Sequence, residues 1–162
     1  DGVRRADLAN TDVTQFEDFV IGQANDPEGV SIDPVTHFVF WNNYDGGIWK
    51  KHVNGSGEVQ IAGGEGGGST IIINNRVFFD EYIASGDIRI KSANLDGTGV
   101  ATVATGISRV VFGLAYDKKS NKIYWGDRNK LNIMRANTDG SDAEIWFSGL
   151  STRGITIGKR KL

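Results

Sequence analysis

The chain repeats itself at an interval of a little over forty residues. Residues 90–98 read IKSANLDGT and residues 133–141 read IMRANTDGS, so that Asn94 and Asn137 stand 43 residues apart. A weaker copy starts at Lys50. A period of about 40–45 residues with short strand-like pieces is typical of the blades of a β-propeller. Repeats of this kind bind ligands on a rim or face that all of them share. We therefore do not expect a single sequence motif to form a catalytic cleft.

A second motif recurs in step with the first. Residues 39–43 (VFWNN), 77–81 (VFFDE) and 123–127 (IYWGD) each place two adjacent aromatic residues after a β-branched one. Because neighbouring residues of a strand point to opposite faces of the sheet, each pair fills the gaps on both sides of its blade. We therefore assign four aromatic residues to the structural core: Trp41, Phe79, Tyr124 and Trp125.

These motifs predict an all-β chain built from four-stranded blades. The 22 glycines and two prolines indicate many turns. Asn74 and Asn75 predict a two-residue hairpin turn, because Asn tolerates the positive φ that such a turn requires. We treat residues 1–162 as a single propeller domain. Its complete blades are expected at residues 29–62, 69–104 and 112–148.

The two ends of the chain are incomplete in complementary ways. Residues 2–8 and 16–21 resemble the third and fourth strands of a blade, and residues 154–157 resemble a first strand. We therefore expect one more blade, formed by residues 2–21 together with residues 154–162, which gives about four repeats per chain. Closing it would remove the strand edges that an open arc exposes. The sequence does not decide whether this blade closes within one chain or between two chains.

The composition excludes several classes of protein. A net charge of −2 gives no indication of a nucleic-acid partner. No apolar run approaches the ~20 residues of a membrane-spanning helix, so we expect no membrane insertion. The chain has no cysteine and therefore neither disulfides nor thiolate metal sites. It begins with Asp1 rather than Met, from which we expect a processed form or a fragment.

The repeat motifs resemble the YWTD, or class B, repeat of the low-density lipoprotein receptor family. Residues 124–127 (YWGD) match three of the four tetrad positions, and residues 135–141 (RANTDGS) are close to the family's RANLDGS. Residues 113–117 and 27–33 match its GLAxD and PxGxxxD pieces. The resemblance implies a non-enzymatic, secreted extracellular module without a cofactor. It would recognise a protein or peptide ligand on one face of the propeller.

The chain departs from the family pattern in three respects. Family propellers have six blades, whereas this sequence holds about four repeats. It contains none of the Cys-rich modules that usually flank the propeller, and two tetrads are altered, at residues 40–43 and 78–81. The shortfall leaves three arrangements open: a four-bladed ring, a ring shared between chains of a homo-oligomer, or a fragment of a larger ring.

The resemblance also implies where a ligand binds. In these propellers the residues around the central opening of one face hold the ligand. The residue before the glycine that starts a blade's first strand lies near that opening, and the residue after each tetrad lies on the same side. The six candidates in this sequence are Glu28, Tyr44, Tyr82, Phe112, Arg128 and Arg153.

Other functions stay open from the residues alone. Several near-equivalent blades suit a multivalent lectin-like protein, assembled from several chains and binding a glycan. A propeller hydrolase and a storage or matrix protein are further alternatives. We favour a non-enzyme, because neither His37 nor His52 has the neighbouring Ser/Asp pattern of a catalytic triad. No metal-ligand spacing stands out, and Asn54 starts the sequence Asn-Gly-Ser, a candidate glycosylation site in a turn.

Overall fold

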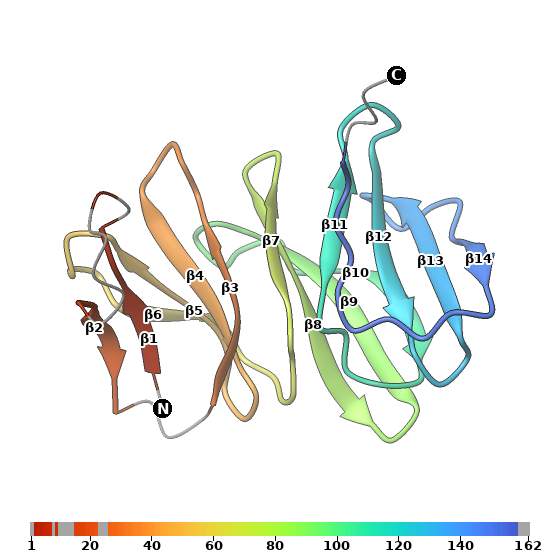
Figure 1. Cartoon of the computed structure of the whole chain (residues 1–162), viewed down its shortest axis with the longest axis horizontal. Helices are drawn as coiled ribbons and strands as arrows, with labels where there is room; N and C mark the ends of the chain where they lie inside the picture. Colours follow the sequence, from red (N-terminus) through yellow and green to blue (C-terminus); the bar gives the residue numbers. More distant parts are fainter. Residues whose placement is uncertain (1, 8, 10–14, 23–25, 159–162) are drawn as a thin grey trace.

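The computed structural model describes residues 2–7, 9, 15–22 and 26–158, and within them every regular element is a β-strand. The strands form one two-stranded sheet and three four-stranded sheets. Figure 1 shows the four sheets side by side in an arc, in the order of the sequence. The expectation of an all-β chain with blade-like sheets is confirmed.

Each sheet joins strands that are neighbours in the sequence. The two-stranded sheet contains β1 (Gly2–Arg5) and β2 (Glu17–Ile21). The next contains β3 (Pro27–Ile32), β4 (Phe38–Asn43), β5 (Gly47–His52) and β6 (Val59–Ala62). The third contains β7 (Thr70–Ile73), β8 (Arg76–Ala84), β9 (Asp87–Asn94) and β10 (Ala101–Ile107). The last contains β11 (Leu114–Asp117), β12 (Lys122–Asp127), β13 (Asn132–Asn137) and β14 (Glu144–Ser148).

The predicted hairpin turn between β7 and β8 is confirmed. Asn74 and Asn75 have φ values of 49° and 61°, and the flanking Ile73 and Arg76 pair with each other. Both residues therefore occupy the left-handed region, which Asn enters at a lower cost than most side chains.

The repeated Asn-x-Asp-Gly segments form equivalent turns after β9 and β13. The carboxylate of Asp96 accepts the backbone N–H of Thr98, and that of Asp139 accepts the N–H of Ser141, both at 2.9 Å. A Cβ on Gly140 would lie 2.5 Å from the carbonyl oxygen of Val103 in the preceding sheet. The strongest repeat in the sequence is thus a turn that packs against its neighbour, where only glycine fits.

The aromatic pairs fill the spaces between sheets. Phe40 and Phe79 meet in one buried cluster between the second and third sheets. Phe78 and Trp125 meet in the next cluster, between the third and fourth sheets. The first residue of each pair therefore faces the following sheet and the second faces the preceding one. Trp41, Phe79, Tyr124 and Trp125, assigned to the core from the sequence, are all buried.

The third tetrad position links the second sheet to the third, and the third sheet toward the fourth, through polar contacts. The side-chain N–H of Asn42 donates to the carbonyl oxygen of Asp80, 2.9 Å away in the following sheet. The buried carboxylate of Asp80 accepts three backbone N–H groups, from Gly68 at 2.9 Å, Ser69 at 2.8 Å and Val111 at 2.9 Å. Val111 lies in the segment that leads from β10 into the fourth sheet, so the two altered tetrads supply links between sheets.

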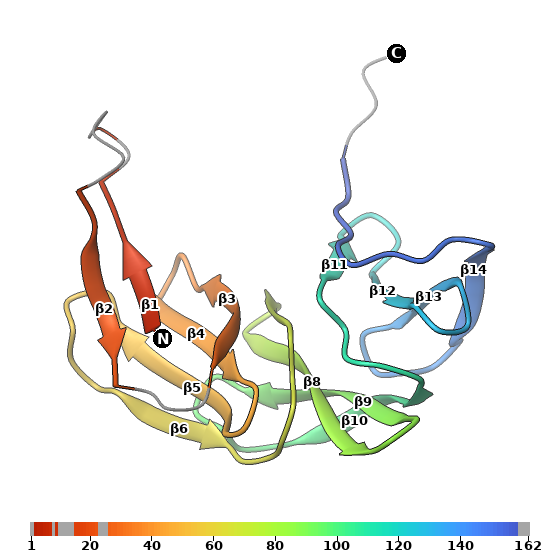
Figure 2. The same ribbon diagram turned by 60° about the horizontal axis from the view of Figure 1, so that its bottom comes forward.

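The two ends of the arc differ from its middle. β1 and β2 pair only with each other and pack on the second sheet through Phe19 and Val20. At the other end Ile155 packs on Tyr124. Figure 2 shows the N-terminal sheet and the C-terminal segment at opposite ends of the arc.

The C-terminal segment differs from the sequence-based expectation. Residues 149–158 contain no strand, although residues 154–157 were expected to form one. A strand needs a neighbour for its backbone N–H and C=O groups, and no strand pairs with residues 154–157 in the part of the chain that the structure describes. Residues 159–162, the remainder of the expected shared blade, lie outside the described residues, as do residues 8, 10–14 and 23–25.

Candidate functional site

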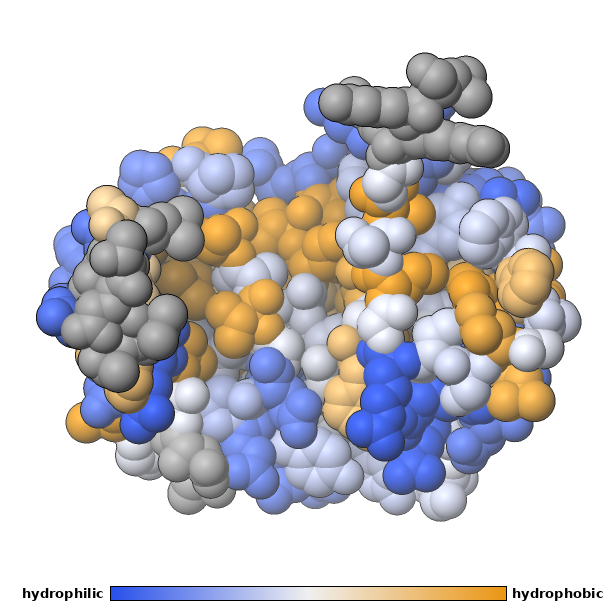
Figure 3. All heavy atoms as spheres, viewed as in Figure 1, coloured by the Kyte–Doolittle hydropathy of each residue, from blue (hydrophilic) through white to orange (hydrophobic). Residues whose placement is uncertain are grey.

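One rim of the arc gathers the residues predicted to bind a ligand. In each four-stranded sheet the first strand starts where the second one ends, as the pairs Pro27–Asn43, Thr70–Phe79 and Leu114–Trp125 show. Residues just before the first strands therefore share an edge with residues just after the second strands. Figure 3 shows hydrophilic residues at the lower edge of the molecule, where β8 and β12 end. We call this edge the start rim; the predicted residues on it are Glu28, Tyr44, Tyr82, Phe112, Arg128 and Arg153.

Tyr44 and Tyr82 line one cavity of about 250 Å³ on the start rim. The loop that joins the second and third sheets passes between them at Gly66, whose N–H donates to the carbonyl oxygen of Tyr44. A Cβ on Gly66 would lie 2.5 Å from the Cβ of Tyr82, and its φ is 66°. The glycine run of residues 63–68 therefore lets the loop pass close to both rings. The cavity is also lined by Ser85, Gly86, Ile88, Ser108, Arg109, Val110 and Asn129.

Three arginines come together beside this cavity. The guanidinium of Arg128 lies over the ring of Phe112, 4.8 Å from its centroid. Partial burial lowers the pKa of Arg128, and the positive charges of Arg109 and Arg153 lower it further. Among the described residues, none of these arginines forms an ion pair. The Nε of Arg128 is buried and has no hydrogen-bond partner there. We call Arg109, Arg128 and Arg153 the arginine cluster.

The remaining predicted site residue lies apart from the cluster. Glu28 is exposed near the start of β3, on the same rim but two sheets away from β12. Asn54, the candidate glycosylation site, is exposed in the turn after β5, where its side chain accepts a hydrogen bond from the N–H of Ser56 at 3.0 Å.

Two parts of this arrangement escaped the sequence analysis. Arg109 lies in the segment between β10 and β11, outside every repeated motif, so no position in the repeat pointed to it. Asp80 belongs to an altered tetrad, and the sequence analysis gave it no role, yet its carboxylate is enclosed by backbone N–H groups. Burial raises the pKa of Asp80 to about 7, against the opposing effect of those N–H groups.

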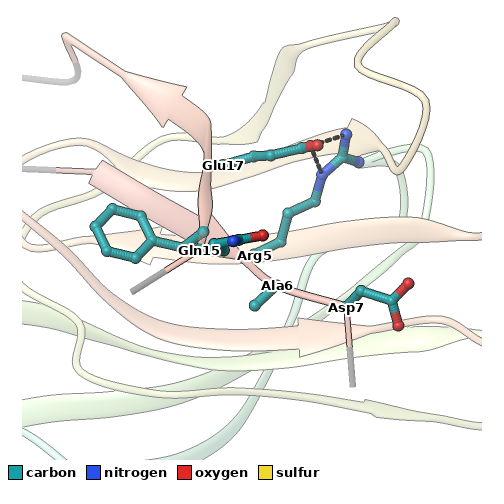
Figure 4. Close-up of a pocket in the computed structure, with 6 residues that line it drawn as sticks. Arg5, Ala6, Asp7, Gln15 and Glu17 are labelled. Carbon is teal, nitrogen blue, oxygen red and sulfur yellow. Dashed lines mark hydrogen bonds and ion pairs between the residues drawn. The ribbon is translucent and has the colours of Figure 1, made fainter. Parts of the chain in front are cut away.

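A larger cavity, of about 580 Å³, lies near Arg5 and Glu17 at the opposite rim. Figure 4 shows the side chains of Arg5 and Glu17 pointing toward each other, and they pair at 2.8 Å. Arg5 also donates to the carbonyl oxygen of Val53, in the turn after β5. Because Arg5 and Glu17 already have partners, we expect this cavity to bind an ionic ligand less well than the arginine cluster does.

The described residues hold no group of three or more His, Cys, Asp or Glu side chains that could bind a metal ion. No helix long and apolar enough to cross a membrane occurs in that part of the chain. His37 and His52 lie near each other, with ring centroids 6.4 Å apart. His52 accepts the backbone N–H of Asn54 through Nδ1 at 3.1 Å, which is a turn contact.

Comparison with known proteins supports the propeller fold. No model of a known protein family matches the chain. A low-density lipoprotein receptor-related protein 1 of Pyricularia oryzae is 39% identical over 64 residues, which cover 37% of this chain and 21% of that protein. This chain therefore spans far less than the full length of the curated relative.

Solved structures resemble a much larger part of the chain. A chain of the nidogen/laminin complex aligns with a TM-score of 0.75 and 18% identity, over 89% of this chain and 57% of that one. The WD40 domain of Neurospora crassa Pan2 aligns with a TM-score of 0.57 and 8% identity, over 83% of this chain and 42% of that one. At such identities the likeness establishes the fold alone: the chain consists of consecutive β-propeller blades.

Proposed function

We propose that the chain is a non-enzymatic extracellular module that binds a protein or peptide on its start rim. The observation that carries this proposal is the grouping of exposed aromatic rings with unpaired arginines on one edge. Tyr44, Tyr82 and Phe112 are all partly exposed there, and the arginine cluster lies beside them. Tyrosine and arginine are among the residues that contribute most to protein interfaces.

The comparisons support the same function. One matching structure is a complex between two proteins, nidogen and laminin, and one matching curated protein is named as related to a receptor. A protein ligand at the rim of a propeller agrees with both. The repeat motifs, which resemble the YWTD class B repeat, support an extracellular location.

Selection from a library tests the proposed function. A phage library of random dodecapeptides would be selected on the immobilised chain, and each selected peptide would be measured by surface plasmon resonance against Tyr82→Ala and Lys118→Ala. We expect Tyr82→Ala to weaken binding and Lys118→Ala, at the exposed turn on the opposite rim, to leave it unchanged. Peptides that bind all three proteins equally, or no enrichment at all, would contradict a ligand site on the start rim.

We also propose that a second copy completes the N-terminal blade. Val30 and Ile32 of β3 are 50% and 54% exposed, whereas Leu114 and Tyr116, at the same positions in β11, pack in the core between sheets. The two residues line an apolar groove of about 320 Å³ beside β1. An inner strand of the incomplete sheet would cover this groove.

The proposed occupant is the C-terminal segment, residues 154–162, of another chain. Within one copy the described part of this segment, residues 154–158, packs on the last sheet through Ile155, at the far end of the arc from β1. The C-terminal segment of a second copy is therefore better placed to cover the groove than that of the same chain. The C-terminal end of one copy would then contact the N-terminal end of the next, which is a head-to-tail arrangement. Light scattering should give a multiple of 17.6 kDa, and Ile32→Asp should reduce it. A mass of 17.6 kDa for the wild type at high concentration would contradict the shared blade.

A further inference from the structure

We infer that the arginine cluster is a carboxylate-binding subsite, so that the ligand of the start rim is an acidic peptide segment. This inference rests on the proposed function and adds the chemistry of the ligand. The three arginines come from separate segments: the loop before β11, the end of β12 and the segment after β14. Arg109 lines the cavity of the two tyrosines, and Arg128 lies over Phe112. The charges of Arg109 and Arg153 both act on Arg128.

The cluster is unfavourable for the free chain. Like charges close together repel, and the two neighbouring arginines lower the pKa of Arg128 along with its partial burial. None of the described carboxylates pairs with the three guanidinium groups. A protein of net charge −2 has acidic side chains available elsewhere. An unpaired positive cluster in such a chain therefore fits an anion that comes from outside.

The geometry of Arg128 favours a ligand with a planar anionic group. Its guanidinium is held over the ring of Phe112 at 4.8 Å, which fixes the orientation of its N–H groups. Its buried Nε has no partner among the described residues. A carboxylate accepts two parallel N–H bonds from a guanidinium, and a fixed guanidinium loses less entropy on forming them.

The surroundings favour a peptide over a sulfated glycan. Positive charges for a long polyanion extend along a face, whereas these three lie in one place. The neighbouring cavity lined by Tyr44 and Tyr82, about 250 Å³, is large enough for a side chain next to the acidic residue. We therefore expect a short motif in which an Asp or Glu is adjacent to a bulky residue.

The test uses the full chain and pairs of synthetic peptides. Each dodecapeptide selected on the start rim would be synthesised with its Asp and Glu residues, and again with Asn and Gln at those positions. Fluorescence anisotropy would measure both forms, and a fluorescent heparin hexasaccharide, against the wild type, Arg128→Gln and Arg153→Gln. Lys118→Gln removes the same charge from the opposite rim and serves as the matched control.

We expect the acidic peptides to bind the wild type about 10- to 100-fold more tightly than their amide counterparts, because hydrogen bonds to charged groups are worth more than neutral ones. Each arginine variant should remove most of that difference, and Lys118→Gln should keep it. Peptides that need Tyr82 but bind equally well in both forms would overturn the inference and leave the proposed function standing. Binding of heparin alone that depends on the arginines would also overturn it. The absence of any peptide that depends on the start rim would overturn both.

Discussion

Replacing Asp80 by Asn tests the polar link between sheets most directly. The carboxylate is buried, with Oδ1 accepting the N–H groups of Gly68 and Ser69 and Oδ2 accepting that of Val111. An Asn side chain keeps one carbonyl oxygen but turns an NH₂ group toward Val111. A buried donor left without an acceptor costs ~1–3 kcal/mol. We expect the variant to be destabilised by about that amount where wild-type Asp80 is neutral.

The cost depends on pH, because burial raises the pKa of Asp80 from 3.8 to about 7. A carboxyl whose pKa is higher in the folded than in the unfolded state stabilises the fold fully below the unfolded value. That stabilisation is lost as the pH rises through the folded value. Between pH 5 and pH 8 the wild type therefore loses roughly 2–3 kcal/mol at 1.36 kcal/mol per pKa unit. Asp80→Asn, which does not titrate, lacks this loss.

Urea unfolding followed by tryptophan fluorescence measures both effects, since Trp41 and Trp125 are buried. We expect Asp80→Asn to be clearly less stable than the wild type at pH 5 and near or above it at pH 8. Asp45→Asn, which changes an exposed carboxylate, is the control and should match the wild type at both pH values. A deficit of Asp80→Asn that stayed constant or grew with pH would refute the reasoning. It would mean that the three N–H groups keep the carboxylate ionised.

Three further outcomes can be measured by thermal unfolding. Gly29→Ala should destabilise the chain by about 1–3 kcal/mol, because the added Cβ would lie 2.5 Å from the Cα of Ser69, which directly precedes β7 of the next sheet. A variant of wild-type stability would show that the sheets can separate freely. Trp125→Ala should lower the free energy of unfolding by ~3–5 kcal/mol. Trp146→Ala, at a residue that is 51% exposed, should lower the melting temperature much less than Trp125→Ala does. Equal losses of stability in the two variants would contradict the assigned core. Arg128→Gln should leave stability unchanged or raise it, because it relieves repulsion; a large loss would assign Arg128 to folding.

The sequence predicted the repeating parts of the fold well, because those parts depend on local chemistry. The turn at Asn74 and Asn75 needs positive φ at two successive residues, and Asn is one of the few side chains that tolerate it. The aromatic pairs such as Phe78 and Phe79 follow from the alternation of side chains along a strand. Such rules act within a few residues, so one sequence is enough to apply them.

The links between sheets were beyond this reasoning. The tetrads at residues 40–43 and 78–81 looked like degraded copies, although Asn42 and Asp80 make the hydrogen bonds between sheets. Their partners are backbone groups that approach only when the sheets pack. Because nearly every residue carries the same backbone groups, the sequence does not show which of them will be these partners. The resemblance to the YWTD repeat named Arg128 and Arg153 as ligand-binding candidates, which stays a prediction, and it did not point to Arg109.

The polar links at Asn42 and Asp80 bear on how the chain unfolds. In the part of the chain that the structure describes, the buried clusters between sheets join neighbours along the arc. The stability of such a repeat protein is approximately a sum of terms for single sheets and for adjacent pairs. The link at Asp80 joins the third sheet to the fourth, and weakening it lowers the coupling of that pair alone. With this coupling reduced, the last sheet can melt before the rest. A single cooperative transition would then become two, and hydrogen exchange would locate the boundary between β10 and β11.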